Sequence, residues 1–357
     1  LYMIDPLNIK ITGTGSYIPS QIQKNSDFLN HTFLTNDGLP FDVENAEIIE
    51  KFSSITGIKE RRYATQDQNS SDLAAHAAAK AITDSKIDQE TLDYIIVAHN
   101  FGDTRFGSKQ SNSLPSVASK VKAALGIKNP KCVAYDILFG CPGWIEGVIQ
   151  AKAFIKSGMA KKCLVIGTET LSRVVDANDR DSMIFADGAG ATIIQDSDKS
   201  GGIMAHESVT YTDNNEVDML FFGDSYETNN SDQFIKMQGR KVYEFALSRV
   251  PDAMKACLDQ SGTSIQNLKK IFIHQANEKM DEAIVKRFYR LYKEKVPVDV
   301  LPMNIETYGN SSVATIPTLF DQVLKGQKDG HELAKGDVVL FASVGAGMNI
   351  NAITYQI

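Results

Sequence analysis

Cys141 is the residue whose sequence context best suits a nucleophile. A short apolar run of strand-forming residues stops at Gly140, and apolar residues at helical spacing follow from Trp144. Pro142 suits the first turn of that helix, because its missing N–H costs nothing there, so we expect Cys141 at or next to the N-cap. A thiolate there would face unpaired backbone N–H groups and the positive end of the helix dipole, which lowers a cysteine pKa. A lone cysteine is more often a small core residue than a nucleophile. Whether Cys141 is a nucleophile therefore depends on partner residues elsewhere in the chain.

Two polar residues of the second half of the chain are candidate partners for Cys141. His274 ends the apolar strand-like run Leu268–His274, directly before a polar helix that begins near Asn277. Asn310 lies in a turn that opens another helix, where an asparagine alone would be an N-cap. Cysteine, histidine and asparagine together form a known catalytic set. These residue types serve acyl transfer as well as cysteine hydrolases, so both remain open at this point.

The elements that must position these residues form an internal repeat. Leu92–Val97 matches Leu268–Ile273, and Gly188–Gly190 matches Gly345–Gly347, with offsets of 176 and 157 residues obtained by subtracting the paired numbers. Strands alternate with helices, which predicts parallel or mixed sheets covered by helices, in two similar α/β halves at 1–198 and 199–357. Ligand sites in such sheets form at the carboxyl ends of strands. Strands are expected at 8–18, 92–99, 163–167, 187–195, 268–274 and 338–342, helices at 70–80, 117–125, 240–260 and 278–292, and polar connections at 101–116 and 196–235.

Composition narrows the classes of molecule that the protein is expected to bind. The chain has 357 residues and a net charge of -7, which argues against a nucleic-acid binder. No apolar run approaches the roughly 18 residues that a membrane helix needs, and Leu1–Asp5 lacks the basic start of a signal peptide, so we expect a cytoplasmic protein without a membrane contact. Four cysteines far apart suit free thiols. No metal-ligand spacing is present, and we expect no metal and no cofactor.

Four segments together carry a family resemblance. They are Gly140–Gly143, Ile273–Asn277, Gly309–Pro317 and Gly345–Met348, and they resemble the active-site motifs of the β-ketoacyl-acyl-carrier-protein synthase III family. The resemblance implies an α/β thiolase-like fold, with duplicated α-β-α-β-α layers and two mixed sheets. The resemblance extends over nearly the whole chain. Further matching segments are Thr56–Arg61, Asp179–Arg180 and Phe185–Gly190.

The resemblance implies a 3-oxoacyl-carrier-protein synthase that works in two steps. Cys141 would take an acyl group from a thioester, with the backbone N–H groups of Cys141 and Ala346 as the oxyanion hole. His274 and Asn310 would then stabilise the enolate left when a malonyl-type thioester loses CO₂, and that carbanion would attack the acyl-Cys carbon.

Further residues are expected to bind the substrates and the partners. Lys279, Lys286 and Arg290 fall on one face of the helix after His274, where an acidic acyl carrier protein would dock. Asn277 and Lys279 are also expected to contact the substrate. Among the adenine-binding positions of coenzyme-A-using relatives, Arg180 is kept, whereas Lys51 and Ile55 replace the usual residues, so acyl-CoA and acyl-carrier donors both remain open.

Leu114 stands where many relatives carry an aromatic residue that closes the acyl tunnel of the partner subunit. We therefore expect a homodimer and an acyl group larger than acetyl. Two alternatives remain: a condensing enzyme of specialised metabolism, of the dialkylresorcinol or quinolone type with a non-malonyl extender, and a cysteine hydrolase.

Overall fold

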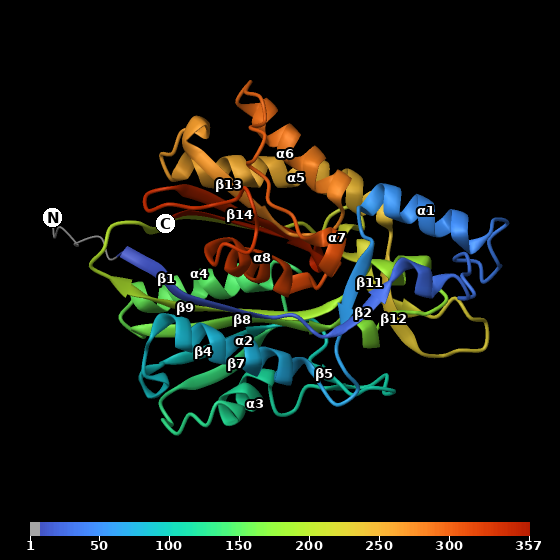
Figure 1. Cartoon of the computed structure of the whole chain (residues 1–357), viewed down its shortest axis with the longest axis horizontal. Helices are drawn as coiled ribbons and strands as arrows, with labels where there is room; N and C mark the ends of the chain where they lie inside the picture. Colours follow the sequence, from blue (N-terminus) through green and yellow to red (C-terminus); the bar gives the residue numbers. More distant parts are fainter. Residues whose placement is uncertain (1–7) are drawn as a thin grey trace.

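The computed structural model describes residues 8–357, so the expectation about Leu1–Asp5 lies outside the described residues. The chain forms five layers of helices and sheets in the order α-β-α-β-α (Figure 1). Two mixed sheets are separated by helices α4 (Gly143–Lys156) and α8 (Thr315–Leu324), while α2 (Ser70–Ser85) and α3 (Val117–Ala124) cover one outer face and α5 (Gly239–Gln260) and α6 (Glu278–Leu291) cover the other. The predicted α/β thiolase-like architecture is confirmed.

The first sheet has the strand order β1-β9-β8-β4-β7. Strand β4 pairs in parallel with β7 and β8, whereas β9 pairs antiparallel with β8 and β1. The carboxyl ends of β4, β7 and β8 therefore meet at one edge, from which the chain runs on toward Cys141. The bounds are β1 Asn8–Tyr17, β4 Tyr94–Ala98, β7 Val133–Ile137, β8 Lys162–Thr170 and β9 Asp187–Ser197.

The second sheet repeats this pattern with one strand fewer, in the order β10-β15-β14-β13. Strand β13 is parallel to β14, and β15 is antiparallel to β14 and β10. Strands β4 and β13 are thus equivalent, as the Leu92 and Leu268 segments predict. The glycine match is wrong in register, because Gly188–Gly190 lies inside β9 whereas Gly345–Gly347 ends β14 and turns toward β15. The bounds are β10 Gly202–Thr210, β13 Leu268–Ile273, β14 Val338–Gly345 and β15 Asn349–Gln356.

The expectation of a polar connection over 196–235 is also wrong, because that stretch holds strand β10 and most of the hairpin β11–β12. Strand β10 lies at an edge of its sheet and most of its residues are partly buried or exposed, so its sequence lacks a run of apolar residues. The loop 101–116 contains a short hairpin, β5–β6. The remaining bounds are β2 Gln21–Lys24, α1 Asn45–Thr56, β3 Glu60–Tyr63, β5 Asp103–Thr104, β6 Ser111–Asn112, β11 Leu220–Asp224, β12 Gln233–Met237 and α7 Ile305–Tyr308.

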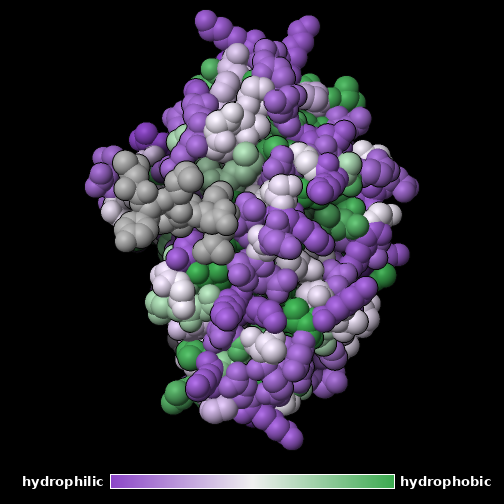
Figure 2. Space-filling model, turned by 90° about the vertical axis from the view of Figure 1, so that its left-hand side faces the viewer, coloured by the Kyte–Doolittle hydropathy of each residue, from purple (hydrophilic) through white to green (hydrophobic). Residues whose placement is uncertain are grey.

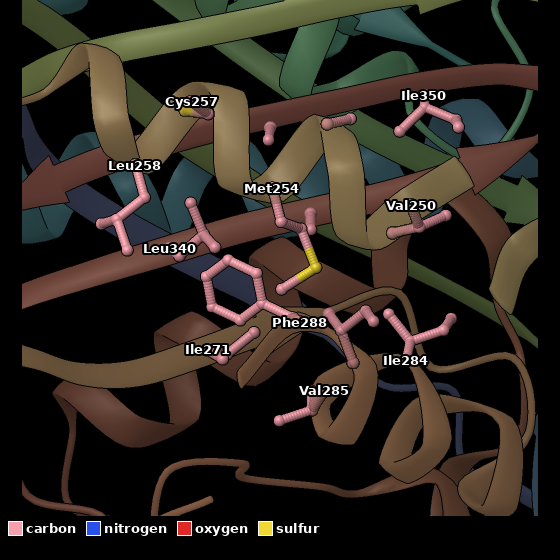
Figure 3. Close-up of a cluster of buried hydrophobic side chains, with 14 of the residues drawn as sticks. Val250, Met254, Cys257, Leu258, Ile271, Ile284, Val285, Phe288, Leu340 and Ile350 are labelled. Carbon is pink, nitrogen blue, oxygen red and sulfur yellow. The ribbon is translucent and has the colours of Figure 1, made fainter. Parts of the chain in front are cut away.

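Apolar packing holds the layers together. Figure 3 shows the outer cluster, in which Met254 of α5 and Phe288 of α6 pack with Leu340 of β14. In the central layer, Trp144 of α4 meets the edge of Phe341 of β14, with ring centroids 5.6 Å apart. Because α4 is fixed between the two sheets, Cys141 at its start is held rigidly.

One face of the molecule is mostly polar (Figure 2). The face in Figure 2 is largely hydrophilic, with hydrophobic residues in small scattered groups. Within residues 8–357, no helix combines the length and the apolar character needed to cross a bilayer.

Candidate active site

Two glycine turns from opposite halves of the chain touch at Cys141. An added Cβ on Gly140 would lie 2.7 Å from the Ala346 nitrogen, and one on Gly345 would lie 2.3 Å from the Cys141 nitrogen. Gly140 also has a positive φ of 70°, which favours glycine. The two residues predicted to supply oxyanion-hole N–H groups are therefore brought together, and only glycine permits this approach.

Cys141 lies directly before the N-cap of α4, which is Pro142 itself. The prediction that the cysteine is next to the cap is confirmed. The predicted low thiol pKa is wrong: burial raises the pKa of Cys141 to about 11, the Glu169 carboxylate adds to the rise, and a hydrogen bond from Ser312 opposes it. Ser312 Oγ lies 3.3 Å from Cys141 Sγ. Desolvation of a thiolate between the two sheets is the largest cause of the rise, and the position of Cys141 at a helix start does not indicate it.

His274 follows β13 and is buried, with its backbone N–H bonded to the Ala342 carbonyl at 2.9 Å. Its Nδ1 lies 2.9 Å from Thr315 Oγ1, and burial lowers the pKa of His274 to about 3, so the ring is neutral near pH 7. Thr315 Oγ1 also lies 2.9 Å from the Ser312 carbonyl oxygen. A hydroxyl has one proton. Because the Ser312 carbonyl can only accept, that proton is donated to it, so His274 Nδ1–H donates to Thr315 Oγ1 and the neutral ring leaves Nε2 as an acceptor.

Asn310 is buried in a tightly held turn. Its backbone N–H donates to the Ile184 carbonyl at 3.0 Å, and its carbonyl accepts from Ala186 N–H at 2.8 Å. The side-chain Oδ1 accepts from Ser312 N–H at 2.8 Å, which leaves the Nδ2 group as the donor. Asn310 does not cap α8, whose N-cap is Ala314.

Ser312 connects all three predicted catalytic residues. Its hydroxyl lies against Cys141, its N–H bonds Asn310, and its carbonyl is linked to His274 through Thr315. Ser312 lies inside the Gly309–Pro317 segment of the family resemblance, but that segment alone indicates no role for it. The sequence carries one signal for it, a serine two residues after the candidate Asn310.

Glu169 and Asn100 are two more polar residues near the cysteine that could not be predicted from the sequence. Glu169 on β8 is 1% exposed, and Asn100 follows β4. Asn100 Nδ2 donates to Glu169 Oε1 at 2.6 Å and to Ser312 Oγ at 3.0 Å. No local pattern marks either residue, because their pairing arises only when β4 and β8 align.

The predicted substrate residues differ in their exposure and their local contacts. Leu114 is 87% exposed, next to the β5–β6 hairpin. Arg180 is half-exposed, with its guanidinium 5.1 Å from the centroid of the Phe41 ring, and Lys51 and Ile55 are exposed on α1. Asn277 caps α6 by accepting from Met280 N–H at 3.0 Å.

The predicted docking face of α6 is solvent-accessible, since Lys279, Lys286 and Arg290 are all exposed. Lys286 and Arg290 also line a pocket of about 920 Å³ together with the exposed Val298, whereas Lys279 lies outside it. None of Cys141, His274 and Asn310 lines this pocket.

The duplicated fold, with a partly buried cysteine joined through Ser312 to a histidine and an asparagine, defines a condensing enzyme of the thiolase-like class. Residues 135–213 match the family model of 3-oxoacyl-[acyl-carrier-protein] synthase III, and residues 258–357 match the model of its C-terminal part. The chain belongs to the β-ketoacyl-acyl-carrier-protein synthase III family, whose members are acyltransferases.

Relatives and solved structures agree over nearly the full length. The chain is 33% identical over 339 residues to β-ketoacyl-[acyl-carrier-protein] synthase III 1 of Vibrio vulnificus, covering 95% of this chain and 96% of that protein. It is also 33% identical over 350 residues to the Neisseria gonorrhoeae enzyme of that name, with 97% and 98% covered. The crystal structure of the Aquifex aeolicus synthase III superposes with a TM-score of 0.80 at 29% identity, covering 98% and 100%. These relatives favour neither the hydrolase nor the specialised-metabolism alternative.

Proposed function

We propose that this chain transfers an acyl group from a thioester to Cys141 and condenses it with a malonyl-type thioester on an acyl carrier protein. The observation that supports this most is the contact between the Gly140–Cys141 turn and the Gly345–Ala346 turn. It brings two backbone N–H groups to the nucleophile, where an oxyanion would form.

In the second half-reaction, His274 and Asn310 serve as hydrogen-bond donors. The malonyl carboxylate leaves as CO₂, and negative charge develops on the thioester oxygen as the enolate forms. The Asn310 amide donates to that oxygen, and His274 donates to it from Nε2 once the Thr315 hydroxyl turns from the Ser312 carbonyl to Nδ1. The carbanion then attacks the acyl-Cys carbon, and the C–S bond to Cys141 breaks to give the 3-oxoacyl product.

We also propose that two copies of the chain form a homodimer. Strand β7 lies at the edge of its sheet. Val133, its first residue, is 47% exposed, and Leu138, directly after it, is 69% exposed. Pairing this edge with a second copy would cover it and give a homodimer. Leu114 would then reach the partner's acyl pocket, which would accept chains longer than acetyl. The halves would be residues 1–198, with the nucleophile, and 199–357, with His274 and Asn310.

An acyl carrier protein would dock on the exposed basic face of α6. Lys279, Lys286 and Arg290 offer positive charge to an acidic carrier, Asn277 and Lys279 would contact the phosphopantetheine arm, and Arg180 would contact a coenzyme A donor if one is used. We propose that the enzyme is located in the cytoplasm. Its action on a substrate bound to an acyl carrier protein and its four free thiols both support this location.

Separating the two half-reactions tests this function. We expect His274→Ala and Asn310→Ala to leave formation of acyl-Cys141 largely intact and to cut condensation by about 10²-fold or more each. Intact mass measures the first step, and release of the 3-oxoacyl product measures the second. Equal loss in both steps would instead indicate that His274 activates the nucleophile.

A further inference from the structure

The loop 31–41, which precedes α1, is hydrogen-bonded to the segment that carries Arg180. Leu34 N–H donates to the Asn178 carbonyl at 2.8 Å, and Asn178 Nδ2 donates to the Thr32 carbonyl at 2.9 Å. Asn178 lies close before Arg180 in the chain, so these two bonds fix the path of the loop beside the Arg180 side chain.

Phe41, the last residue of this loop, covers one face of the Arg180 guanidinium. The guanidinium carbon lies 5.1 Å from the centroid of the Phe41 ring. The ring is itself partly buried against a small apolar cluster. The buried members of this cluster are Phe28, Phe33, Ile48, Ile49 and Met183. A guanidinium can stack on a flat ring of a ligand. Here one stacking face of Arg180 is already used within the chain.

Arg180 stands at the outer end of a short 3₁₀ turn that leads to the catalytic centre. The turn runs from Arg180 to Ile184, and the Ile184 carbonyl accepts from Asn310 N–H at 3.0 Å. The Arg180 side chain is 50% exposed, whereas Asn310 is buried. A thioester donor that enters along this turn therefore has its outer end beside Arg180.

The charges around this loop also disfavour a nucleotide. Residues 25–50 include six acidic residues and no lysine or arginine. Asp181 Oδ1 lies 4.0 Å from Arg180 Nε, so a carboxylate already faces the guanidinium. The nucleotide of coenzyme A carries a diphosphate and a 3′-phosphate, and both are anionic near pH 7. These groups would meet like charge along the loop and a cation that is partly neutralised.

We propose that Phe41 and the acidic loop 31–41 exclude the nucleotide of coenzyme A, so that the acyl donor is an acyl carrier protein, whose phosphopantetheine arm bears no nucleotide. This rests on the proposed acylation of Cys141 and names the donor that it leaves open. In the transfer, a C–S bond forms at Cys141 Sγ and the C–S bond of the donor breaks. The Cys141 proton leaves on the thiol of the carrier's arm.

Three octanoyl donors with the same thioester test this exclusion: octanoyl-carrier protein, octanoyl-phosphopantetheine and octanoyl-CoA. Intact mass gives the second-order rate of Cys141 acylation by each. In the unmodified enzyme, octanoyl-CoA should react within about twofold of octanoyl-phosphopantetheine, and octanoyl-carrier protein about tenfold faster than either.

Variants of the loop assign the exclusion to Phe41. Phe41→Ala should raise the ratio of the CoA rate to the phosphopantetheine rate about fivefold, the size of one exposed stacking contact with a guanidinium. Adding Arg180→Ala to Phe41→Ala should remove that gain. Leu39→Ala changes a 63% exposed side chain of the same loop, and this matched control should leave the ratio within about twofold. Each ratio compares donors within one variant, so a loss of folded protein cancels.

Several results would overturn the exclusion. Octanoyl-CoA reacting about tenfold faster than octanoyl-phosphopantetheine in the unmodified enzyme would show that the nucleotide is bound, even if Phe41→Ala does not fold. A lower ratio in Phe41→Ala would make Phe41 a contact of the nucleotide, and an unchanged ratio would show that Phe41 excludes nothing. Octanoyl-carrier protein reacting more slowly than octanoyl-phosphopantetheine would remove the carrier as donor. Failure of the proposed function looks different, because none of the three donors would then acylate Cys141.

Discussion

Replacing Gly345 by alanine should disable the oxyanion hole while leaving the fold in place. Gly345 has φ of -163° and ψ of -171°, an extended conformation that any residue adopts, so alanine brings no backbone strain. Its Cβ would nevertheless lie 2.3 Å from the Cys141 nitrogen and 3.0 Å from Cys141 Cβ, against an ordinary contact of 3.4 Å or more. The shortfall at the nitrogen, 3.4 minus 2.3, is 1.1 Å, and the two turns must separate by a comparable amount.

A displacement of about 1 Å at a reacting centre costs roughly 10²-fold in rate, and losing one oxyanion donor costs roughly 10² to 10³-fold. We therefore expect Gly345→Ala to slow the acylation of Cys141 by about 10²-fold, measured by intact mass after mixing with an acyl thioester. Gly239→Ala is the matched control, because its Cβ would meet only Met237 Cε at 3.8 Å. Acylation of Gly345→Ala at the unmodified rate, with an unchanged melting temperature, would refute the reasoning.

Four further variants probe specificity, docking and the second half-reaction. Leu114→Phe should shift self-acylation toward short chains; a tunnel longer by four methylenes is worth about 3 kcal/mol, or roughly a hundredfold, and an unchanged chain-length profile or a monomer in solution would contradict it. Lys279→Glu and Lys286→Glu should raise KM for malonyl-carrier protein about tenfold, in a salt-dependent way, yet leave acylation by a small thioester unchanged; equal effects on both would argue against docking on α6. Thr315→Val removes the hydroxyl beside His274 Nδ1 and should slow condensation about tenfold while sparing acylation, and the opposite pattern would show that His274 acts on the nucleophile.

The elements with strong periodicity could be predicted from the sequence, and those shaped by the assembled sheets could not. The strand 268–274 and the helices at 240–260 and 278–292 agree with β13, α5 and α6 within one or two residues, because apolar residues recur there at the right spacing. Strand β10 lacks such a signal, since it lies at the sheet edge.

Within the site too, features encoded by local motifs could be predicted, whereas features that arise only when the sheets assemble could not. The glycine motifs predict the approach of Cys141 to Ala346, because close backbone contact needs glycine on both sides. The rise in the Cys141 pKa and the Glu169–Asn100–Ser312 path were missed for a common reason. Both depend on which polar groups become buried together when β4, β8 and the Asn310 turn meet, and no local spacing encodes that.

Peptide mapping of the acylated enzyme tests the central claim most directly. After incubation with an acyl thioester, the acyl group should be found on Cys141 alone and should leave as the 3-oxoacyl product when malonyl-carrier protein is added. Cys141→Ala should take up no acyl group, since Cys132, Cys163 and Cys257 are buried in the core clusters. Stoichiometric acylation of any of those three cysteines, or release of the acyl group from Cys141 as a free acid without condensation, would contradict the account.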